Sequence, residues 1–354
     1  MLYQLKLGEN NMRYLKSSYD SLMTYSSNKI EDGIVLNANE APYNPPSEIL
    51  DEFYEVLKNV NFNRYPDMMN SSLCSHIAKA FKVKESQVTC GVGSDELLDV
   101  IFKAVLENND KVISFSPSFS MYKVFASLVG AEFISIELNT DFSFDVEKMI
   151  QSINEFKPKL VCLCSPNNPT GQTLSINDIE KIVSSTDALV LLDLAYVDFA
   201  STDCTYLATK YDNLIVLRTF SKAYALASIR CGYAISKEEN INMINMVKLP
   251  YSLSVESALL AKIAITHKNL YTPLIDKIKN ERDRVYLGLY KLGLAVYPSE
   301  ANFIFVIMDD KYYDELLKNK IYIRKIDSRK YRITIGNENE NNRLIEVLKC
   351  VVIN

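Results

Sequence analysis

Short apolar runs alternate with helix-type patterns through the middle of the chain, beginning near residue 87. The apolar runs predict strands over 87–90, 111–115, 131–138, 159–164, 188–192 and 214–217. The stretches between them repeat apolar residues at helical spacing and predict helices over 94–106, 119–129, 146–156 and 176–184. Strands that alternate with helices of this length indicate crossover connections and a mainly parallel sheet. The run 188–192 is apolar at every position, as a strand buried on both faces requires.

The pattern changes after Pro250. A long helical pattern runs from 254 to 292 and is followed by strand-like runs over 302–306, 321–324 and 331–335 and by a final helix. This order predicts a second, smaller α+β unit, and at 354 residues the chain is long enough for two domains. The fold class expected is therefore α/β, with a large domain whose mainly parallel sheet is flanked by helices.

Composition narrows the possible functions. The chain is 48% apolar and 23% charged, has a net charge of −5, and its basic residues are spread out, so we expect no nucleic-acid surface and no membrane segment. Seven cysteines without framework spacing indicate a reducing, cytoplasmic location. With only two histidines in the chain, Cys162 and Cys164 are interpreted as buried thiols, and no metal is expected.

Lys222 is the strongest candidate for chemistry. It follows the apolar run 214–217 in a short loop that also carries Thr219 and Ser221, and Arg230 comes eight residues later. A lysine that reacts as a neutral amine needs partial desolvation to lower its pKa. Hydroxyls and a guanidinium nearby would bind a phosphate through charge-assisted hydrogen bonds. Together they suit an aldehyde cofactor that carries a phosphate, pyridoxal 5′-phosphate (PLP).

Other polar motifs also follow predicted strands, where ligands bind in open α/β sheets. The segment 91–96, Gly-Val-Gly-Ser-Asp-Glu, opens a helix; Gly93 allows close backbone approach, Ser94 is expected to cap the helix, and the N–H groups beside Asp95 could bind a phosphate. The segment 165–171, Ser-Pro-Asn-Asn-Pro-Thr-Gly, holds Asn168 between prolines. Asp193 ends the most apolar strand, where a carboxylate needs a partner.

These motifs, in this order, closely resemble those of the fold-type I PLP-dependent aminotransferases and, within them, the histidinol-phosphate aminotransferase family. The resemblance runs from Leu36 to Gly336. It implies a large PLP-binding domain over 37–250 and a small domain over 1–36 and 251–354. It further implies that Asp193 pairs with the pyridine nitrogen, Asn168 and Tyr196 bind the phenolic oxygen, and Phe119 stacks on the ring. Tyr65 would reach the cofactor phosphate of a neighbouring subunit in a homodimer.

The sequence departs from the family pattern at two positions. Leu194 stands where the family motif has glutamate, and Ser228 stands where glycine is more usual. On the substrate side, the resemblance implies that Arg332 clamps a substrate carboxylate, Arg324 binds a substrate phosphate, and Asn39 lines the entrance.

The resemblance implies a ping-pong aminotransferase that takes the amino group from glutamate. Lys222 would anchor the cofactor and then act as a general base. The leading acceptor is imidazole acetol phosphate, which gives histidinol phosphate. Three alternatives stay open: a decarboxylase of phosphoserine or phosphothreonine, an aminotransferase for another small phosphate or ketose of surface-polysaccharide precursors, and a non-catalytic PLP-binding regulator.

Overall fold

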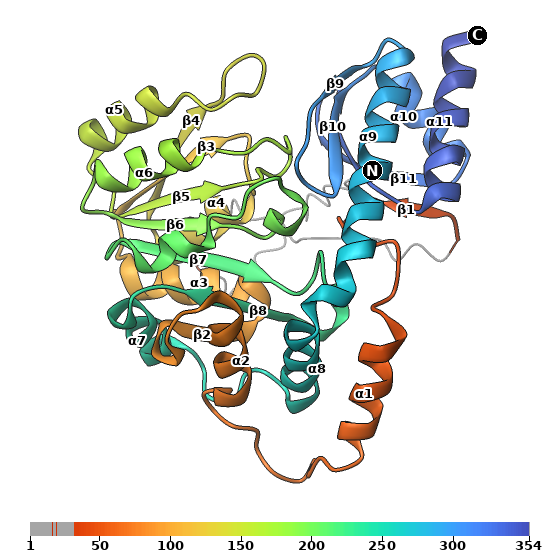
Figure 1. Ribbon diagram of the computed structural model, residues 1–354. Coiled ribbons are helices and arrows are strands. Elements are labelled where there is room, and N and C mark those ends of the chain that lie inside the picture. Colours follow the sequence, from red (N-terminus) through yellow and green to blue (C-terminus); the bar gives the residue numbers. More distant parts are fainter. Residues whose placement is uncertain (1–15, 17–18, 20–31, 354) are drawn as a thin grey trace.

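The computed structural model describes residues 16, 19 and 32–353, and it contains two sheets (Figure 1). The larger sheet has seven strands in the order β2-β8-β7-β6-β5-β3-β4, and the smaller has five in the order β1-β11-β12-β10-β9. Figure 1 shows helices on both sides of the larger sheet and α9 to α11 beside the smaller one. The predicted α/β architecture with a second α+β unit is confirmed.

The larger sheet is mainly parallel. Its strands are β2 (Val88–Val92), β3 (Lys111–Ser116), β4 (Glu132–Glu137), β5 (Leu160–Cys164), β6 (Leu189–Asp193), β7 (Leu214–Thr219) and β8 (Cys231–Ile235). Only β8 runs antiparallel to its neighbours β2 and β7 within this sheet. The carboxyl ends of the other six strands therefore meet at one edge, which is where ligands bind in such sheets.

Helices cover both faces of this sheet. They are α1 (Ser47–Leu57), α2 (Ser71–Phe81), α3 (Gly93–Val105), α4 (Met121–Val129), α5 (Val146–Phe156), α6 (Ile176–Ser184), α7 (Glu238–Val247) and α8 (Val255–Thr266). Along β5, Val161 and Leu163 belong to one buried cluster, whereas Cys162 and Cys164 belong to another. Successive side chains point to opposite faces, so the strand must be apolar throughout.

The smaller sheet draws on distant parts of the chain. Its strands are β1 (Ile34–Leu36), β9 (Ala295–Tyr297), β10 (Phe303–Ile307), β11 (Ile321–Asp327) and β12 (Lys330–Thr334), with helices α9 (Thr272–Lys291), α10 (Asp310–Lys318) and α11 (Glu338–Ile353). β1 pairs in parallel with β11, and residues 37–39 lead from it towards the larger sheet. The domain bounds at 36/37 and 250/251 stay a prediction, and residues 1–15, 17–18 and 20–31 of the first segment lie outside the described residues.

Two local predictions were wrong, and one strand was missed. The pattern over 254–292 forms two helices rather than one, because α8 ends at Thr266 and the short 3-10 turn Lys268–Tyr271 separates it from α9. Strand β8 was not predicted, because it lies directly behind the lysine motif with no loop signal before it. Ser94 does not cap α3: the helix begins one residue earlier, at Gly93, and Val92 occupies the cap position.

Within the described residues, no helix is both long and apolar enough to span a membrane.

Candidate active site

The sequence-predicted cofactor residues gather at the carboxyl edge of the larger sheet. Asp193 ends β6, Thr219 ends β7, and Gly93 follows β2. Asn168 lies in the loop after β5, and Phe119 lies between β3 and α4. Adjacent parallel strands thus deliver residues from five distant segments to one place.

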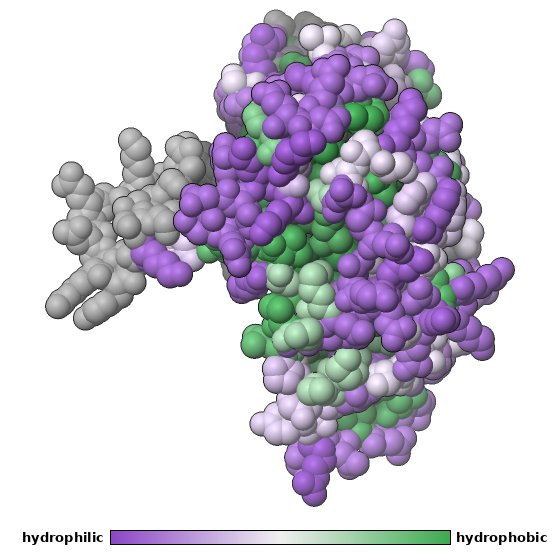
Figure 2. All heavy atoms as spheres, turned by 90° about the vertical axis from the view of Figure 1, so that its left-hand side faces the viewer, coloured by the Kyte–Doolittle hydropathy of each residue, from purple (hydrophilic) through white to green (hydrophobic). Residues whose placement is uncertain are grey.

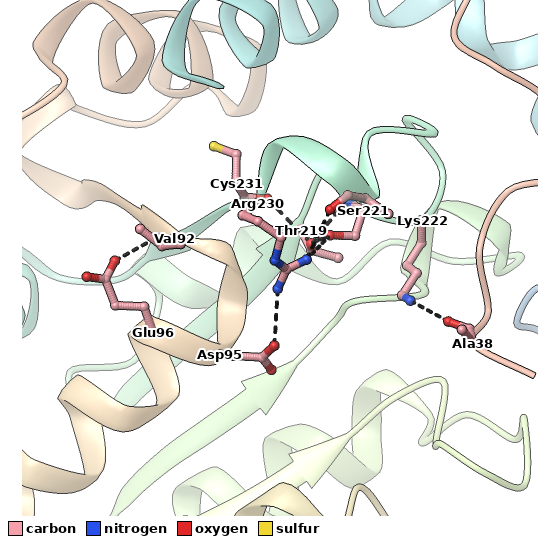
Figure 3. Close-up of polar contacts among 10 residues, drawn as sticks. Ala38, Val92, Asp95, Glu96, Thr219, Ser221, Lys222, Arg230 and Cys231 are labelled. Carbon is pink, nitrogen blue, oxygen red and sulfur yellow. Dashed lines mark hydrogen bonds and ion pairs between the residues drawn. The ribbon is translucent and has the colours of Figure 1, made fainter. Parts of the chain in front are cut away.

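Lys222 lies in the loop after β7, and its amine points away from the side chains of Ser221 and Arg230 (Figure 3). Its Nζ donates to the carbonyl oxygen of Ala38 at 3.1 Å (Figure 3). The same nitrogen lies 6.0 Å from the centroid of the Tyr196 ring. Burial, reinforced by the positive charge of Arg332, lowers the pKa of Lys222 to about 8. A substantial neutral fraction near pH 7–8 makes this amine a competent nucleophile.

Hydroxyl and guanidinium groups cluster beside it, as Figure 3 shows. Thr219 Oγ1 lies 3.0 Å from Ser221 Oγ and accepts the Ser221 N–H at 3.1 Å. Arg230 donates to Ser221 Oγ at 3.4 Å and to the Asp95 carboxylate at 3.3 Å. This cluster of donors faces the start of α3, where the Glu96 carboxylate accepts the Val92 N–H at 2.5 Å and the side chain of the cap residue Val92 makes no hydrogen bond.

The backbone around this cluster fits a phosphate. Gly93 has a φ of 73°, and a Cβ there would lie 2.8 Å from Arg230 Nη2. A Cβ on Gly232 would lie 2.4 Å from the Ser94 backbone nitrogen. Glycine at both positions lets the helix start, β8 and Arg230 approach one another closely. Backbone N–H groups at a helix start, two hydroxyls and a guanidinium are the donor set that a phosphate dianion requires.

Asp193 is held rigidly in a buried position. One carboxylate oxygen accepts the Tyr122 hydroxyl at 2.9 Å, and the other accepts the Ala195 N–H at 3.0 Å. Burial raises the pKa of Asp193 to about 6 in spite of these two hydrogen bonds. Phe119 packs edge-on against Tyr122, with ring centroids 5.5 Å apart. Within the part of the chain that the structure describes, no cation forms an ion pair with this carboxylate, so its chemistry fits a ligand with a cationic nitrogen.

Tyr196, Asn168 and Asn39 form one hydrogen-bonded group. Asn39 Nδ2 donates to the Tyr196 hydroxyl oxygen at 2.9 Å, and Asn168 Nδ2 lies 3.4 Å from the same oxygen. All three residues are buried. Asn39 therefore contacts Tyr196, whereas the sequence had indicated only a place at the substrate entrance.

The two arginines project from the smaller sheet. Arg324 on β11 and Arg332 on β12 are directly opposite each other in the antiparallel register. Arg332 is buried; it donates to Asn168 Oδ1 at 2.7 Å and to the carbonyl oxygen of Asn37 at 2.6 Å. These bonds join the smaller sheet to the cofactor edge of the larger one.

Tyr65 lies away from this cluster, in the loop between α1 and α2. It is 83% exposed, and its ring stacks on Tyr251 with centroids 4.8 Å apart.

Several groups of the site were missed in the sequence. Tyr122 lies three residues after Phe119, in the first turn of α4, and a tyrosine inside such an apolar stretch needs a hydrogen-bond partner when buried. That spacing could have identified it. The carbonyl oxygens of Asn37 and Ala38 could not have been identified, because backbone acceptors have no sequence signal.

Comparison with known proteins agrees with this geometry. Residues 31–348 match the family model "Aminotransferase class I and II". The histidinol-phosphate aminotransferase of Caldanaerobacter subterraneus is 32% identical over 96% of this chain and 98% of its own length. That of Thermococcus gammatolerans is 36% identical over 89% and 91%.

Solved structures share the fold. The histidinol-phosphate aminotransferase of Sinorhizobium meliloti, in complex with pyridoxal-5′-phosphate, superposes with a TM-score of 0.89 at 22% identity, covering 97% of this chain and 99% of that one. The L-threonine-O-3-phosphate decarboxylase of Porphyromonas gingivalis gives 0.78 at 20% identity over 91% and 100%. The family match over most of the chain leads to one conclusion. The chain belongs to the class I and II aminotransferase family and is a PLP-dependent aminotransferase.

Proposed function

We propose that this enzyme transfers an amino group between glutamate and imidazole acetol phosphate, with histidinol phosphate as the product. Relatives with 32–36% identity across nearly their whole length carry the name histidinol-phosphate aminotransferase. Histidinol phosphate carries a phosphate ester and glutamate carries carboxylates, so the site must accept anions of different shape in turn.

The register of Arg324 against Arg332 is the observation that carries this proposal. Residues directly opposite in an antiparallel pair lie on the same face of the sheet, and like charges there destabilise it. Two arginines on the same face of the sheet could therefore both contact anionic groups of one ligand. We assign the carboxylate to Arg332, whose planar fork allows bidentate contact, and the phosphate to Arg324.

The chain's residues would hold the cofactor as follows. Lys222 is the covalent anchor, Thr219, Ser221, Arg230 and the start of α3 bind the phosphate, and Asp193 faces the ring nitrogen. Phe119 stacks on the ring, and Asn168 and Tyr196 bind the phenolic oxygen. When bound, PLP supplies withdrawal of electrons from the substrate α-carbon. The Lys222 amine would be the group that takes and returns the α-proton of the substrate.

We also propose that the active protein is a cytoplasmic homodimer in which Tyr65 contributes to the partner's site. Tyr65 and Tyr251 belong to a set of exposed apolar residues that also includes Phe62, Met68 and Leu249, in the loops that follow α1 and α7, and Met246, in the last turn of α7. Exposed apolar side chains that lie together mark interaction surfaces, and the Tyr65 and Tyr251 rings are stacked. Figure 2 shows a further face of the molecule, where hydrophobic residues form an uneven band across an otherwise largely hydrophilic surface.

The substrate proposal is tested by separate half-reactions. The PLP form is mixed with histidinol phosphate, glutamate, phosphoserine or phosphothreonine, and loss of the amine and release of CO2 are both followed. We expect amine transfer from histidinol phosphate and glutamate without CO2. Release of CO2 from a phosphorylated amino acid, with no transfer from histidinol phosphate, would establish the decarboxylase alternative instead.

Light scattering on the same sample gives the molecular mass of the protein, and the mass of a monomer would contradict the proposed dimer.

A further inference from the structure

The orientation of the Asn39 amide is fixed by Thr334, which lies at the end of β12. Thr334 Oγ1 accepts the Asn39 backbone N–H at 2.9 Å. Its own proton is then available to Asn39 Oδ1, which lies 3.1 Å away. The amide oxygen and nitrogen of an asparagine are assigned from their partners. Because Oδ1 faces the threonine hydroxyl, Nδ2 must face Tyr196.

The orientation of the Asn168 amide is fixed independently. Arg332 Nη1 can only donate, and it donates to Asn168 Oδ1 at 2.7 Å. Asn168 Nδ2 is thereby turned towards the Tyr196 hydroxyl oxygen. Two different elements, β12 and the loop after β5, thus direct an N–H at the same oxygen atom.

A tyrosine hydroxyl can accept two hydrogen bonds and donate one. With both acceptor positions of Tyr196 facing amides, its proton must point in the remaining direction, away from Asn39 and Asn168. Burial raises the pKa of Tyr196, against the lowering effects of Arg332 on β12 and of Asn39, so the group keeps its proton. The other charged groups facing it are Asp193 on β6 and Lys222, whose Nζ lies over the ring.

The backbone of Asn39 is also held in a defined conformation. Its φ of 55° is left-handed, a conformation that asparagine tolerates better than most residues. The side chain of Asn302, at the start of the β10 region, donates to the Asn39 carbonyl oxygen at 3.0 Å. Asn39 is 1% exposed and Thr334 is 3% exposed, so neither is placed to contact solvent.

We propose that Asn39 and Thr334 are positioning residues that direct the Tyr196 hydroxyl proton towards the cofactor's phenolic oxygen. The inference rests on the proposed contact of Tyr196 with that oxygen. An O–H that donates to the phenolic oxygen stabilises the anionic form of that oxygen. It thereby competes with the proton on the nitrogen through which Lys222 would hold the cofactor. Loss of the donor therefore raises the pH at which the visible absorption of the holoenzyme changes.

The test is a spectrophotometric pH titration of purified holoenzymes, which needs no substrate. Tyr196→Phe removes the donor and sets the full shift, expected upwards by about one pH unit, the scale of one hydrogen bond to a charged group. Asn39→Asp keeps the shape and tolerates the left-handed backbone, but replaces the N–H donor with an acceptor that captures the Tyr196 proton. We expect it to give at least half of the full shift in the same direction.

Thr334→Val and Thr334→Ser test the same positioning role without changing Asn39. The valine removes the hydroxyl that orients the amide and should raise the midpoint, whereas the serine keeps that hydroxyl and should leave the midpoint at the wild-type value. Asn109→Asp is the matched control, because Asn109 is an exposed asparagine with a φ of 69° beyond the opposite end of the sheet. It should change nothing.

Two outcomes separate this inference from the proposed function. If Tyr196→Phe shifts the midpoint but Asn39→Asp and Thr334→Val do not, the positioning role is wrong and the contact of Tyr196 stands. If Tyr196→Phe itself causes no shift, the proposed contact is wrong and the positioning role falls with it. Should Asn39→Asp fail to fold, the Thr334 pair decides alone.

Discussion

The cofactor edge of the larger sheet and the arginine face of the smaller sheet are built differently. At the cofactor edge, Asp193 and the hydroxyls of Thr219 and Ser221 form hydrogen bonds with other residues at the same edge of the larger sheet. On the smaller sheet, Arg332 is held by Asn168 and by the carbonyl oxygen of Asn37, which belong to other parts of the structure. The groups proposed to bind the cofactor are thus held by one another, whereas under our proposal a substrate carboxylate would replace hydrogen bonds that Arg332 already makes.

This difference has a functional consequence. A preorganised charge distribution is what stabilises a transition state, because it need not rearrange during the reaction. Exchangeable contacts suit an enzyme that must release one anion and accept another. Substitutions at the cofactor edge should therefore impair both half-reactions, and substitutions at the arginine face should distinguish between them.

Loss of the lysine should have the largest effect. Lys222→Ala removes both the covalent anchor and the proton carrier, so we expect turnover to fall by several orders of magnitude. PLP should still bind through the residues proposed for its phosphate. Borohydride reduction of the wild-type holoenzyme should fix the cofactor on the peptide that contains Lys222. A modified peptide from another part of the chain would show that the anchor is assigned wrongly.

Asp193→Asn should come next. The substitution keeps the shape and the Tyr122 contact but removes the negative charge opposite the ring nitrogen. We expect the rate of both half-reactions to fall roughly 100- to 1,000-fold, the effect of removing a central preorganised electrostatic contact, with little change in substrate binding. Single-turnover rates measure this directly, and a rate within about threefold of wild type would contradict the pairing.

The cofactor edge was also the part that the sequence predicted best. Strand ends place residues reliably, so Asp193, Asn168 and Lys222 could be located from apolar runs followed by polar motifs. The helical break after Thr266 and the strand β8 were not predictable in this way, because tertiary packing decided them. The contacts of residues 37–39 use backbone carbonyls and one left-handed asparagine, and their partners are up to 295 positions away in the chain. Periodicity carries no information about such contacts.

The arginines should separate the two substrates. Arg324→Ala should leave the glutamate half-reaction unchanged and weaken the reaction with histidinol phosphate by about 1.5–3 kcal/mol, the scale of a hydrogen bond to a charged group. Arg332→Ala should damage the glutamate half-reaction, and Arg332→Lys should restore it poorly because the bidentate fork is lost. Stopped-flow measurement of each half-reaction gives the comparison. Equal damage to both halves by Arg324→Ala would instead assign that residue to the structure or to the cofactor.

The smallest expected effect links the two regions through charge. Burial and the charge of Arg332 lower the pKa of Lys222 to about 8, and only the neutral amine reacts with an aldehyde. Covalent capture of PLP by the cofactor-free protein should therefore speed up as the pH rises towards 8 and level off above it. Removing the charge with Arg332→Ala should move this midpoint upwards by a few tenths of a pH unit, since one of the three lowering influences is gone while burial and the charge of Arg230 remain. Arg343→Ala, at an exposed arginine of α11, is the control and should leave the midpoint unchanged. The rate of appearance of the visible absorption band reports the midpoint. An unchanged midpoint in Arg332→Ala would mean that its charge does not act on Lys222, and the two regions would then be electrostatically independent.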